Sequence, residues 1–264
     1  MSVASLPHLM VAPNGARRTH ADHPKLPVSV AETVQAALKC YSAGADGIHA
    51  HVRDTHAKHV LDAGLYKELI AELTRQVPQL LVQITTEAVG LYTPAQQRQL
   101  VADVQPQRVS VSLSEMLSDN NLPAARDFYH SCHQAGTGVQ HILYSAEELT
   151  RLSKLVHEDI IPSDDLQLLF VLGRYSEQQQ SHPRDLQPFL FAYRQARLQA
   201  DWGLCAFGGG ETDCLVAAHQ AGGKMRVGFE NNLWHSDGTL AKDNAERITE
   251  LLSTLVSSRL ENQT

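Results

Sequence analysis

Short apolar runs alternate with segments of helical period along the whole chain. The apolar runs, rich in β-branched residues, predict eight strands at His8–Ala12, Gly47–Arg53, Leu80–Thr86, Arg108–Leu113, Val139–Tyr144, Leu166–Leu172, Gly203–Phe207 and Met225–Glu230. The helical segments cover 29–43, 64–76, 94–104, 122–135, 146–158, 184–199, 211–221 and 243–257. Each predicted strand is therefore followed by a predicted helix.

Local sequence features support several of these boundaries. Ser29 and Ser145 each stand three residues before a glutamate, which is the spacing of a helix capping box. Gly44 and Gly136 follow predicted helix ends, where the backbone commonly needs a positive φ.

Eight strand–helix units in 264 residues match a (β/α)8 TIM barrel better than an open doubly wound sheet, in which about six strands are usual. No linker or low-complexity segment interrupts the alternation, so we predict a single domain over 1–264. Such barrels carry their chemistry on the loops that follow the carboxyl ends of the strands. The candidate site residues are therefore those at the predicted strand ends.

Composition narrows the class of protein. With 43% hydrophobic and 19% charged residues, the chain is typical of soluble globular proteins. A formal net charge of -7 argues against nucleic acid or an anionic membrane surface as the main partner. The chain has neither a secretory leader pattern nor an apolar run of about 18–20 residues, so we expect a cytoplasmic protein. No CxxC pair occurs, so we expect reduced, buried thiols at Cys40, Cys132, Cys205 and Cys214.

The sharpest local feature is an H-x-H pair on the second predicted strand. His49 and His51 project from one face of the strand, about 6.5 Å apart. Glu230 ends the last predicted strand, on the last-to-first side of a closed barrel. Two histidines and one carboxylate leave an open coordination position, as in catalytic zinc sites, although Fe(II) or Mn(II) would fit the same ligands. A merely hydrogen-bonded histidine pair is the alternative.

Several longer segments follow one another along the chain, and their order is specific to one family: APNGARRTHADHPKLPVSVAE, AGADGIHAHVRD, QITTEA, QHILY, FVLGRY, CAFGGGE and GGKMRVGFENN. From about residue 11 to about residue 250 they resemble the β-keto acid cleavage enzyme family. The resemblance implies a TIM barrel, a catalytic Zn2+ held by His49, His51 and Glu230, and a homo-oligomer such as a dimer or tetramer. It also implies a reaction in which a β-keto acid and acetyl-CoA give acetoacetate and a new acyl-CoA.

The resemblance also suggests residues that bind the substrate. Thr85 occupies the place of a hydroxyl suited to hold the substrate carboxylate, and Thr86 or Ser114 could share that task. Strand-end hydroxyls often bind only loop backbone, which is the alternative. Family members that act on an amino-bearing keto acid carry a glutamate in the place of Arg17. The reversed charge favours a neutral or acidic substituent, unless Glu115 supplies a counter-charge.

The general base is where the chain departs from the family pattern. Arg226 lies on the same strand face as Glu230, about 13 Å away by strand rise. In the family, this arginine pairs with an acidic residue next to the zinc-binding glutamate, but here that neighbour is Asn231, which we therefore assign to substrate binding. Because an amide cannot act as a base near pH 7, Glu87 and Glu115 are the candidate replacements.

A glycine loop and a cation are candidates for binding the CoA part of the co-substrate. Backbone N–H groups of Gly208 and Gly209, just before a predicted helix, could hold a phosphate, and Arg174 could add a positive charge. A plain tight turn is the alternative. Of the nearby polar residues, we expect His59 on a surface loop and Asp54 beside either a ligand histidine or its neighbour, Arg53.

Two other functions remain open at this point. Another metal-dependent TIM-barrel aldolase or hydrolase would use the same open metal site without CoA. A catalytically silent relative would bind metal and keto acid without turnover, because its base is lost at Asn231.

Overall fold

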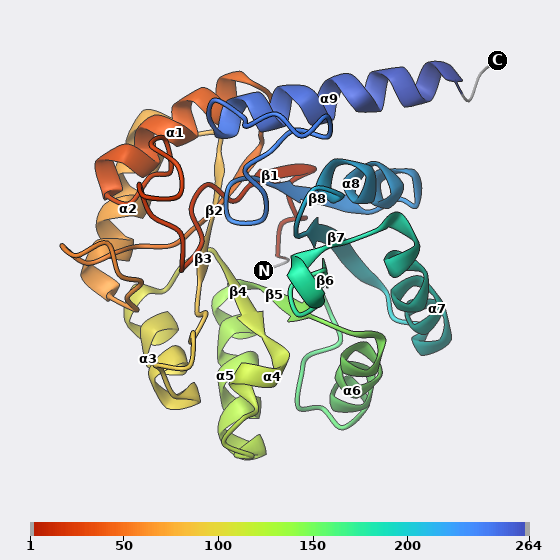
Figure 1. Cartoon of the computed structure of the whole chain (residues 1–264). Helices are drawn as coiled ribbons and strands as arrows, with labels where there is room; N and C mark the ends of the chain where they lie inside the picture. The colour runs from red at the N-terminus through yellow and green to blue at the C-terminus, as the bar shows by residue number, and fades with distance from the viewer. Residues whose placement is uncertain (1–2, 262–264) are drawn as a thin grey trace.

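The computed structural model describes residues 3–261, with side chains through residue 258, and it contains a closed barrel of eight parallel strands (Figure 1). Each strand pairs with the next, and the last pairs with the first. The strands are β1 (Leu9–Val11), β2 (Gly47–Ala50), β3 (Leu81–Thr85), β4 (Arg108–Ser112), β5 (Gly138–Leu143), β6 (Leu166–Leu172), β7 (Ala200–Ala206) and β8 (Lys224–Val227). The predicted TIM barrel is confirmed.

Helices surround the barrel (Figure 1). They are α1 (Val30–Ser42), α2 (Ala63–Gln76), α3 (Pro94–Val104), α4 (Leu113–Met116), α5 (Leu122–Ala135), α6 (Ala146–His157), α7 (Leu186–Ala196), α8 (Glu211–Gln220) and α9 (Asn244–Glu261), with short 3-10 turns η1 (Glu177–Gln179) and η2 (Pro183–Asp185). Of the helices in the described range, none is both long and apolar enough to cross a membrane.

The predicted helix boundaries are largely confirmed. Ser29 forms a complete capping box with Glu32. Ser145 caps only one way, because the Glu148 carboxylate accepts from the N–H of Tyr144 instead. Gly44 and Gly136 have φ of 113° and 76°. The helix predicted over 184–199 was too long, since η2 precedes α7 and a left-handed residue ends it.

Two strands, β2 and β8, each end three residues earlier than predicted, just before the histidine and the glutamate of the predicted metal ligands. β2 stops at Ala50, so His51 follows the strand. β8 stops at Val227, because Gly228 has a φ of 144° and a Cβ there would lie 2.5 Å from the carbonyl oxygen of Ala12. Glu230 therefore lies in a turn and not on an extended strand.

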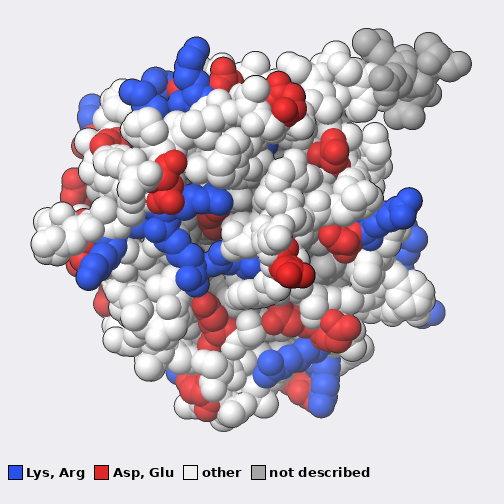
Figure 2. Space-filling model, in the orientation of Figure 1, with Lys and Arg blue, Asp and Glu red and all other residues white. Residues whose placement is uncertain are grey.

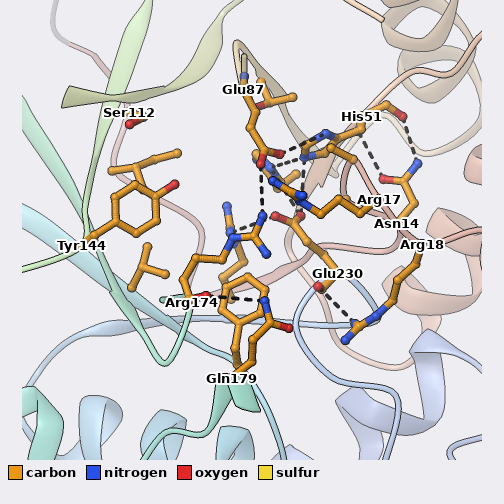
Figure 3. Close-up of a pocket in the computed structure, with 18 residues that line it drawn as sticks. Asn14, Arg17, Arg18, His51, Glu87, Ser112, Tyr144, Arg174, Gln179 and Glu230 are labelled. Atoms are coloured by element: carbon orange, nitrogen blue, oxygen red, sulfur yellow. Dashed lines mark hydrogen bonds and ion pairs between the residues drawn. The ribbon is translucent and has the colours of Figure 1, made fainter. Parts of the chain in front are cut away.

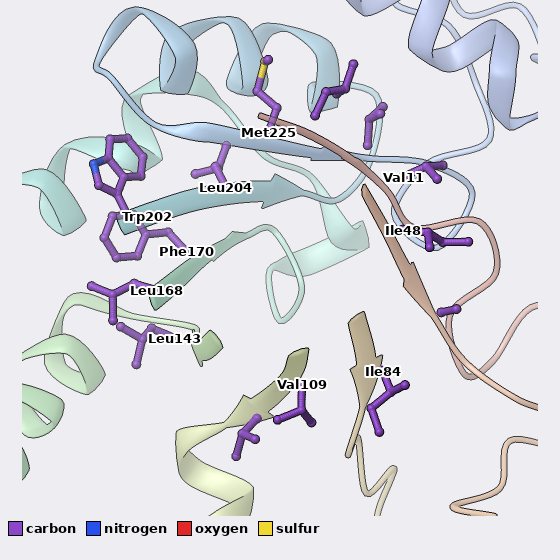
Figure 4. Packing of buried hydrophobic residues seen from close by; sticks show 14 of the residues in the cluster. Val11, Ile48, Ile84, Val109, Leu143, Leu168, Phe170, Trp202, Leu204 and Met225 are labelled. Carbon is purple, nitrogen blue, oxygen red and sulfur yellow. The ribbon is translucent and has the colours of Figure 1, made fainter. Parts of the chain in front are cut away.

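The main core lies between the outer faces of the strands and the helices (Figure 4). Ile48, Ile84 and Val109 are fully buried there. Because side chains alternate along a strand, His49, the neighbour of Ile48, faces into the barrel, where it lines the cavity described below. A smaller apolar cluster reaches the cavity described below and consists of Ile142, Leu169, Val171, Cys205 and Phe207. All four cysteines are free and buried, as expected.

Candidate active site

The predicted ligand set comes together at the carboxyl ends of the strands (Figure 3). His49 Nε2 lies 3.2 Å from His51 Nε2, and Glu230 Oε2 lies 3.5 Å and 3.6 Å from these two atoms. Four ligands in a tetrahedron around a zinc ion, at about 2.0–2.1 Å, are spaced about 3.3–3.4 Å apart. The three atoms therefore have the separation that one small divalent ion requires.

The chain brings these side chains together by closing the barrel. β1 pairs with β2 on one side and β8 on the other, so the second and last strands lie two positions apart. The loop after β1 packs on Glu230 at Gly15, where a Cβ would lie 2.6 Å from Glu230 Cγ and φ is 61°. Only glycine fits that approach without strain. Arg18 donates to the backbone oxygen of Glu230 at 3.1 Å.

A relay of amides orients His49. The Leu168 carbonyl can only accept, so it takes the Gln140 amide N–H at 3.2 Å, and Gln140 Oε1 then accepts from Gln83 at 2.9 Å. Gln83 Oε1 must therefore accept from His49 Nδ1, at 2.8 Å. The lone pair of His49 Nε2 is thereby directed at the ligand cluster.

His59 and a backbone carbonyl orient His51 in the same way. The carbonyl oxygen of Glu87 accepts from His59 Nε2 at 2.8 Å, so His59 Nδ1 accepts from His51 Nδ1 at 3.4 Å. The His51 Nε2 lone pair then also faces the cluster. The expectation that His59 lies on a surface loop was wrong, because it is 5% exposed. Asp54 contacts neither ligand; its carboxylate accepts from the backbone of 56–58.

Three electron-pair donors thus face one another with no proton between them. Glu230 Oε2 is buried and has no hydrogen-bond partner among the described residues. Burial lowers the pKa of His49 to about 4 and that of His51 well below its ordinary value, which keeps both rings neutral. A cation bound by all three atoms removes the repulsion between them. The residues therefore fit a divalent metal ion.

Replacing Gln83 by leucine tests the amide relay. Without the acceptor on His49 Nδ1, the ring loses its fixed orientation, and we expect metal affinity to fall about 10–100-fold. Competition with a chromophoric chelator measures the change. Gln99→Leu, on the exposed face of α3, is the matched control. Unchanged metal affinity in Gln83→Leu would show that the relay does not support the ligand.

A cavity opens beside the ligands. Its lining includes five further predicted residues, namely Arg17, Thr85, Glu87, Arg174 and Arg226 (Figure 3). Ser112, Tyr144, Gln179 and Phe207 also line it.

Glu87 is the cavity carboxylate that lies outside the ligand set. Its Oε2 is 3.8 Å from His51 Nδ1, and its Oε1 is 3.5 Å from Arg174 Nη2. Burial and the neighbouring Glu230 raise the pKa of Glu87 to about 7. Thr85 Oγ1 accepts from the Glu87 N–H at 3.0 Å, which leaves the Thr85 hydroxyl hydrogen free to donate.

Arg226 reaches the ligand cluster directly. Its Nη2 lies 3.3 Å from Glu230 Oε1 and 3.3 Å from Cys205 Sγ. The separation of about 13 Å expected from an extended strand was wrong, because the chain turns at Gly228 and returns Glu230 toward Arg226. By holding Oε1, Arg226 leaves Oε2 for the cluster.

A model of the beta-keto acid cleavage enzyme family matches residues 8–260. The chain belongs to this family. The match runs from β1 into α9 and includes the whole cavity lining. It confirms the resemblance drawn from the sequence segments.

Alignments with two named relatives cover most of this chain. It is 24% identical over 245 residues to the 3-keto-5-aminohexanoate cleavage enzyme of Fusobacterium nucleatum subsp. nucleatum, covering 90% of this chain and 87% of the relative. It is 24% identical over 280 residues to the 3,5-dioxohexanoate:acetyl-CoA acetone transferase of Paraburkholderia graminis, with coverages of 91% and 86%.

Solved structures share the fold. The apo structure of ObcA superposes with a TM-score of 0.70 at 15% identity; the match covers 89% of this chain but spans only 63% of that chain. A type I 3-dehydroquinate dehydratase from Clostridium difficile gives a TM-score of 0.63 at 12% identity, covering 97% and 94%. At these identities the likeness concerns the barrel alone.

The structure places three of the predicted site residues behind the cavity wall. Thr86 donates to the Ser110 carbonyl. Ser112 caps α4, which begins directly after β4 and carries Ser114 and Glu115; the Ser114 hydroxyl lies 3.1 Å from that of Ser112. Neither Ser114 nor Glu115 lines the cavity in this member of the family. Glu115 Oε2 instead accepts from the Ala88 N–H at 2.9 Å and from Gln97 Nε2 at 3.1 Å.

The glycine loop is also outside the cavity lining. The Gly208 N–H donates to the Asn231 carbonyl, and a Cβ on Gly208 would lie 2.2 Å from the Gln179 oxygen. Neither Gly208 nor Gly209 lines the cavity. The segment around η1 therefore lies against this loop.

The prediction that Asn231 binds substrate was wrong, because Asn231 does not line the cavity and faces a buried ion pair instead. It is fully buried, and its amide donates at 3.2 Å to Glu211 Oε1, which also accepts from the Gly228 N–H at 3.2 Å. Glu211 Oε2 is 2.7 Å from Arg247 Nη2, with both side chains fully buried. A carboxylate at position 231 would face the Glu211 carboxylate, so an amide suits this position. The pair holds the turn on both sides of Glu230.

Sequence reasoning missed Gln83, His59, Glu211 and Arg247. The first had a detectable pattern, since Gln83 lies two residues before Thr85 and shares its inward strand face. The other three act through contacts with residues far away in the sequence, which no local pattern encodes.

Proposed function

We propose that this chain exchanges the acyl part of a β-keto acid with acetyl-CoA, giving acetoacetate and the acyl-CoA of the remaining fragment. The observation that carries the proposal is the cluster of His49, His51 and Glu230, which opens into a cavity of a beta-keto acid cleavage enzyme family member. One named relative is an acetyl-CoA acetone transferase, which supports acetyl-CoA as the co-substrate.

We propose zinc as the metal, held by His49 Nε2, His51 Nε2 and Glu230 Oε2. When bound, the ion polarises the ketone and carboxylate oxygens of the keto acid and stabilises the enolate that a carbon nucleophile requires. Arg226 keeps the second oxygen of Glu230 engaged, so that only one oxygen is presented. Thr85 donates its free hydroxyl hydrogen to the substrate carboxylate.

Glu87 acts as the general base in this proposal. It takes the proton from the carbon between the ketone and the carboxylate, and that carbon bonds to the acetyl carbonyl as the CoA thiolate leaves. The thiolate then adds to the original ketone carbon, and the bond between that carbon and the nucleophilic carbon breaks. Glu87 returns the proton to the departing acetoacetate. Atoms and charge balance, and no other reactant is needed.

Arg174 is the proposed contact for the CoA part. It lines the cavity, and its guanidinium lies 5.1 Å from the centre of the Phe207 ring. Because the Gly208 N–H is already bonded, a phosphate site at Gly208 and Gly209 requires the segment around η1 to move. The homo-oligomer and the cytoplasmic location stay predictions.

A purified-enzyme assay tests the proposed exchange. A β-keto acid is incubated with acetyl-CoA, and acetoacetate is followed by NADH oxidation with 3-hydroxybutyrate dehydrogenase. We expect acetoacetate only when both substrates are present. Product formed without acetyl-CoA would indicate an aldolase or hydrolase, and binding without any product would indicate a silent relative.

Glu87→Gln tests the base. The amide keeps the size of the side chain but cannot accept the proton, so we expect kcat to fall about 10²- to 10⁴-fold. KM for the keto acid should change little, because Thr85 and the metal ligands remain. Glu115→Gln is the matched control and should lose far less activity, since Glu115 does not line the cavity. Equal losses in the two variants would remove Glu87 from this role.

A further inference from the structure

Positively charged side chains outnumber negatively charged ones around the cavity. The charged side chains that line it are four arginines and two glutamates, namely Arg17, Arg18, Arg174, Arg226, Glu87 and Glu230. Figure 2 shows lysine and arginine side chains crossing the centre of this face, over a hollow in which carboxylates are visible. The protein's own carboxylates therefore do not balance the cations at the cavity.

Three of the four arginines are already engaged. Arg226 pairs with Glu230 and Arg174 with Glu87. Arg18 donates to backbone oxygens of 229–230. Arg17 forms no hydrogen bond or ion pair with any described residue, although its side chain extends into the cavity beside Glu87 and Glu230 (Figure 3).

The loop that carries Arg17 is fixed on both sides. Asn14 and His51 exchange two hydrogen bonds, of 2.9 and 3.3 Å, through the Asn14 amide and the His51 backbone. The buried guanidinium of Arg53 binds three carbonyl oxygens within 14–18. Arg17 is therefore held at the cavity by a loop with little freedom to withdraw it.

An ammonium group on the substrate would find no free carboxylate here. Glu87 is paired with Arg174, and Glu230 belongs to the ligand cluster. Glu115, the carboxylate that could have supplied the counter-charge, does not line the cavity, and its Oε2 already accepts two hydrogen bonds. A neutral substituent leaves Arg17 unpaired, whereas an anionic substituent pairs with it.

We propose that the natural substrate is a β-keto acid with a second carboxylate at its far end, and that Arg17 binds this distal carboxylate. This inference rests on the proposed cleavage reaction and assigns the substrate class to the same site. It separates this chain from the relative named for an amino-bearing keto acid. Arg17 is then the residue that sets the charge preference.

The test compares six-carbon β-keto acids that carry different charges beyond the ketone. 3-Oxoadipate and 3-oxohexanoate have the same chain length, and 3-keto-5-aminohexanoate adds a positive charge. With saturating acetyl-CoA, we expect kcat/KM for 3-oxoadipate to exceed that for 3-oxohexanoate by about tenfold or more, because one charge-assisted contact is gained. Arg17→Glu should remove this preference and raise kcat/KM for the amino acid substrate, whereas Arg17→Lys should keep part of it.

Controls separate the possible failures. Arg194→Glu makes the same charge change on the exposed face of α7 and should leave the preference unchanged. If no keto acid yields acetoacetate, the cleavage reaction itself is refuted. If all three are cleaved but Arg17→Glu leaves their ranking unchanged, the reaction stands and the assignment of Arg17 is refuted. If Arg17→Glu instead raises KM for acetyl-CoA but not for acetyl-pantetheine, Arg17 binds a CoA phosphate, which also refutes the assignment.

Discussion

His49→Ala is expected to lower kcat/KM for acetoacetate formation on the order of 10³-fold or more. The substitution removes one of three converging donors, and Glu230 Oε2 and His51 Nε2 cannot hold the ion alone in a fixed position. The loss corresponds to several kcal/mol of charge stabilisation in the transition state. Steady-state rates and metal content by plasma mass spectrometry, measured on the same preparations, check the result.

The control is His8→Ala, which removes an exposed histidine just before β1, at the opposite end of the barrel from the cavity. Its metal content and rate should match those of the unsubstituted protein. Chelation followed by addition of Zn2+, Mn2+ or Fe2+ shows which ion restores the rate. Full activity of His49→Ala at unchanged metal content would remove the metal from the mechanism.

Arg247→Met is expected to lower the free energy of unfolding by about 3–5 kcal/mol, because it leaves the Glu211 carboxylate buried without its counter-charge. Both side chains of this pair are fully buried. Arg247 also binds Glu250, so the change removes two ion pairs. Urea unfolding followed by circular dichroism measures the loss.

A second pair of variants separates charge from packing. Arg247→Met combined with Glu211→Gln removes both charges of the buried pair and should recover part of the loss, because a neutral amide is less costly to bury. Arg126→Met breaks the exposed pair with Asp159 and should cost about 0–1 kcal/mol. A loss for Arg247→Met no larger than that of Arg126→Met would contradict the structural role of the pair.

The fold and the ligands were predictable because each depends on a local pattern. Alternating strands and helices predict the barrel, and the i, i+2 spacing of His49 and His51 predicts that they share a face. The predicted end of the last strand at Glu230 indicated the third ligand, although the observed strand ends three residues earlier. The fold and the ligands are therefore predicted correctly even when the predicted ends of a strand or helix are wrong by a few residues.

The residues around the ligands depended on finer detail. Ser114 and Glu115 were predicted at the end of a strand, but Ser112 caps a helix there, and neither residue lines the cavity. The expected separation of about 13 Å between Arg226 and Glu230 applied strand rise beyond a glycine at which the chain turns. The amide relay from Leu168 through Gln140 and Gln83 to His49 joins four strands, so it exists only in the folded barrel.

The ligand cluster spans the seam at which the barrel closes. The histidines leave the ribosome early in synthesis, whereas Glu230 is added only after all eight strands. The nascent chain therefore contains two of the three residues of the cluster, His49 and His51, until translation is nearly finished. Once β8 pairs with β1, a metal ion bound by His49, His51 and Glu230 would link β2 to the turn after β8, so separation of β8 from β1 would require its release.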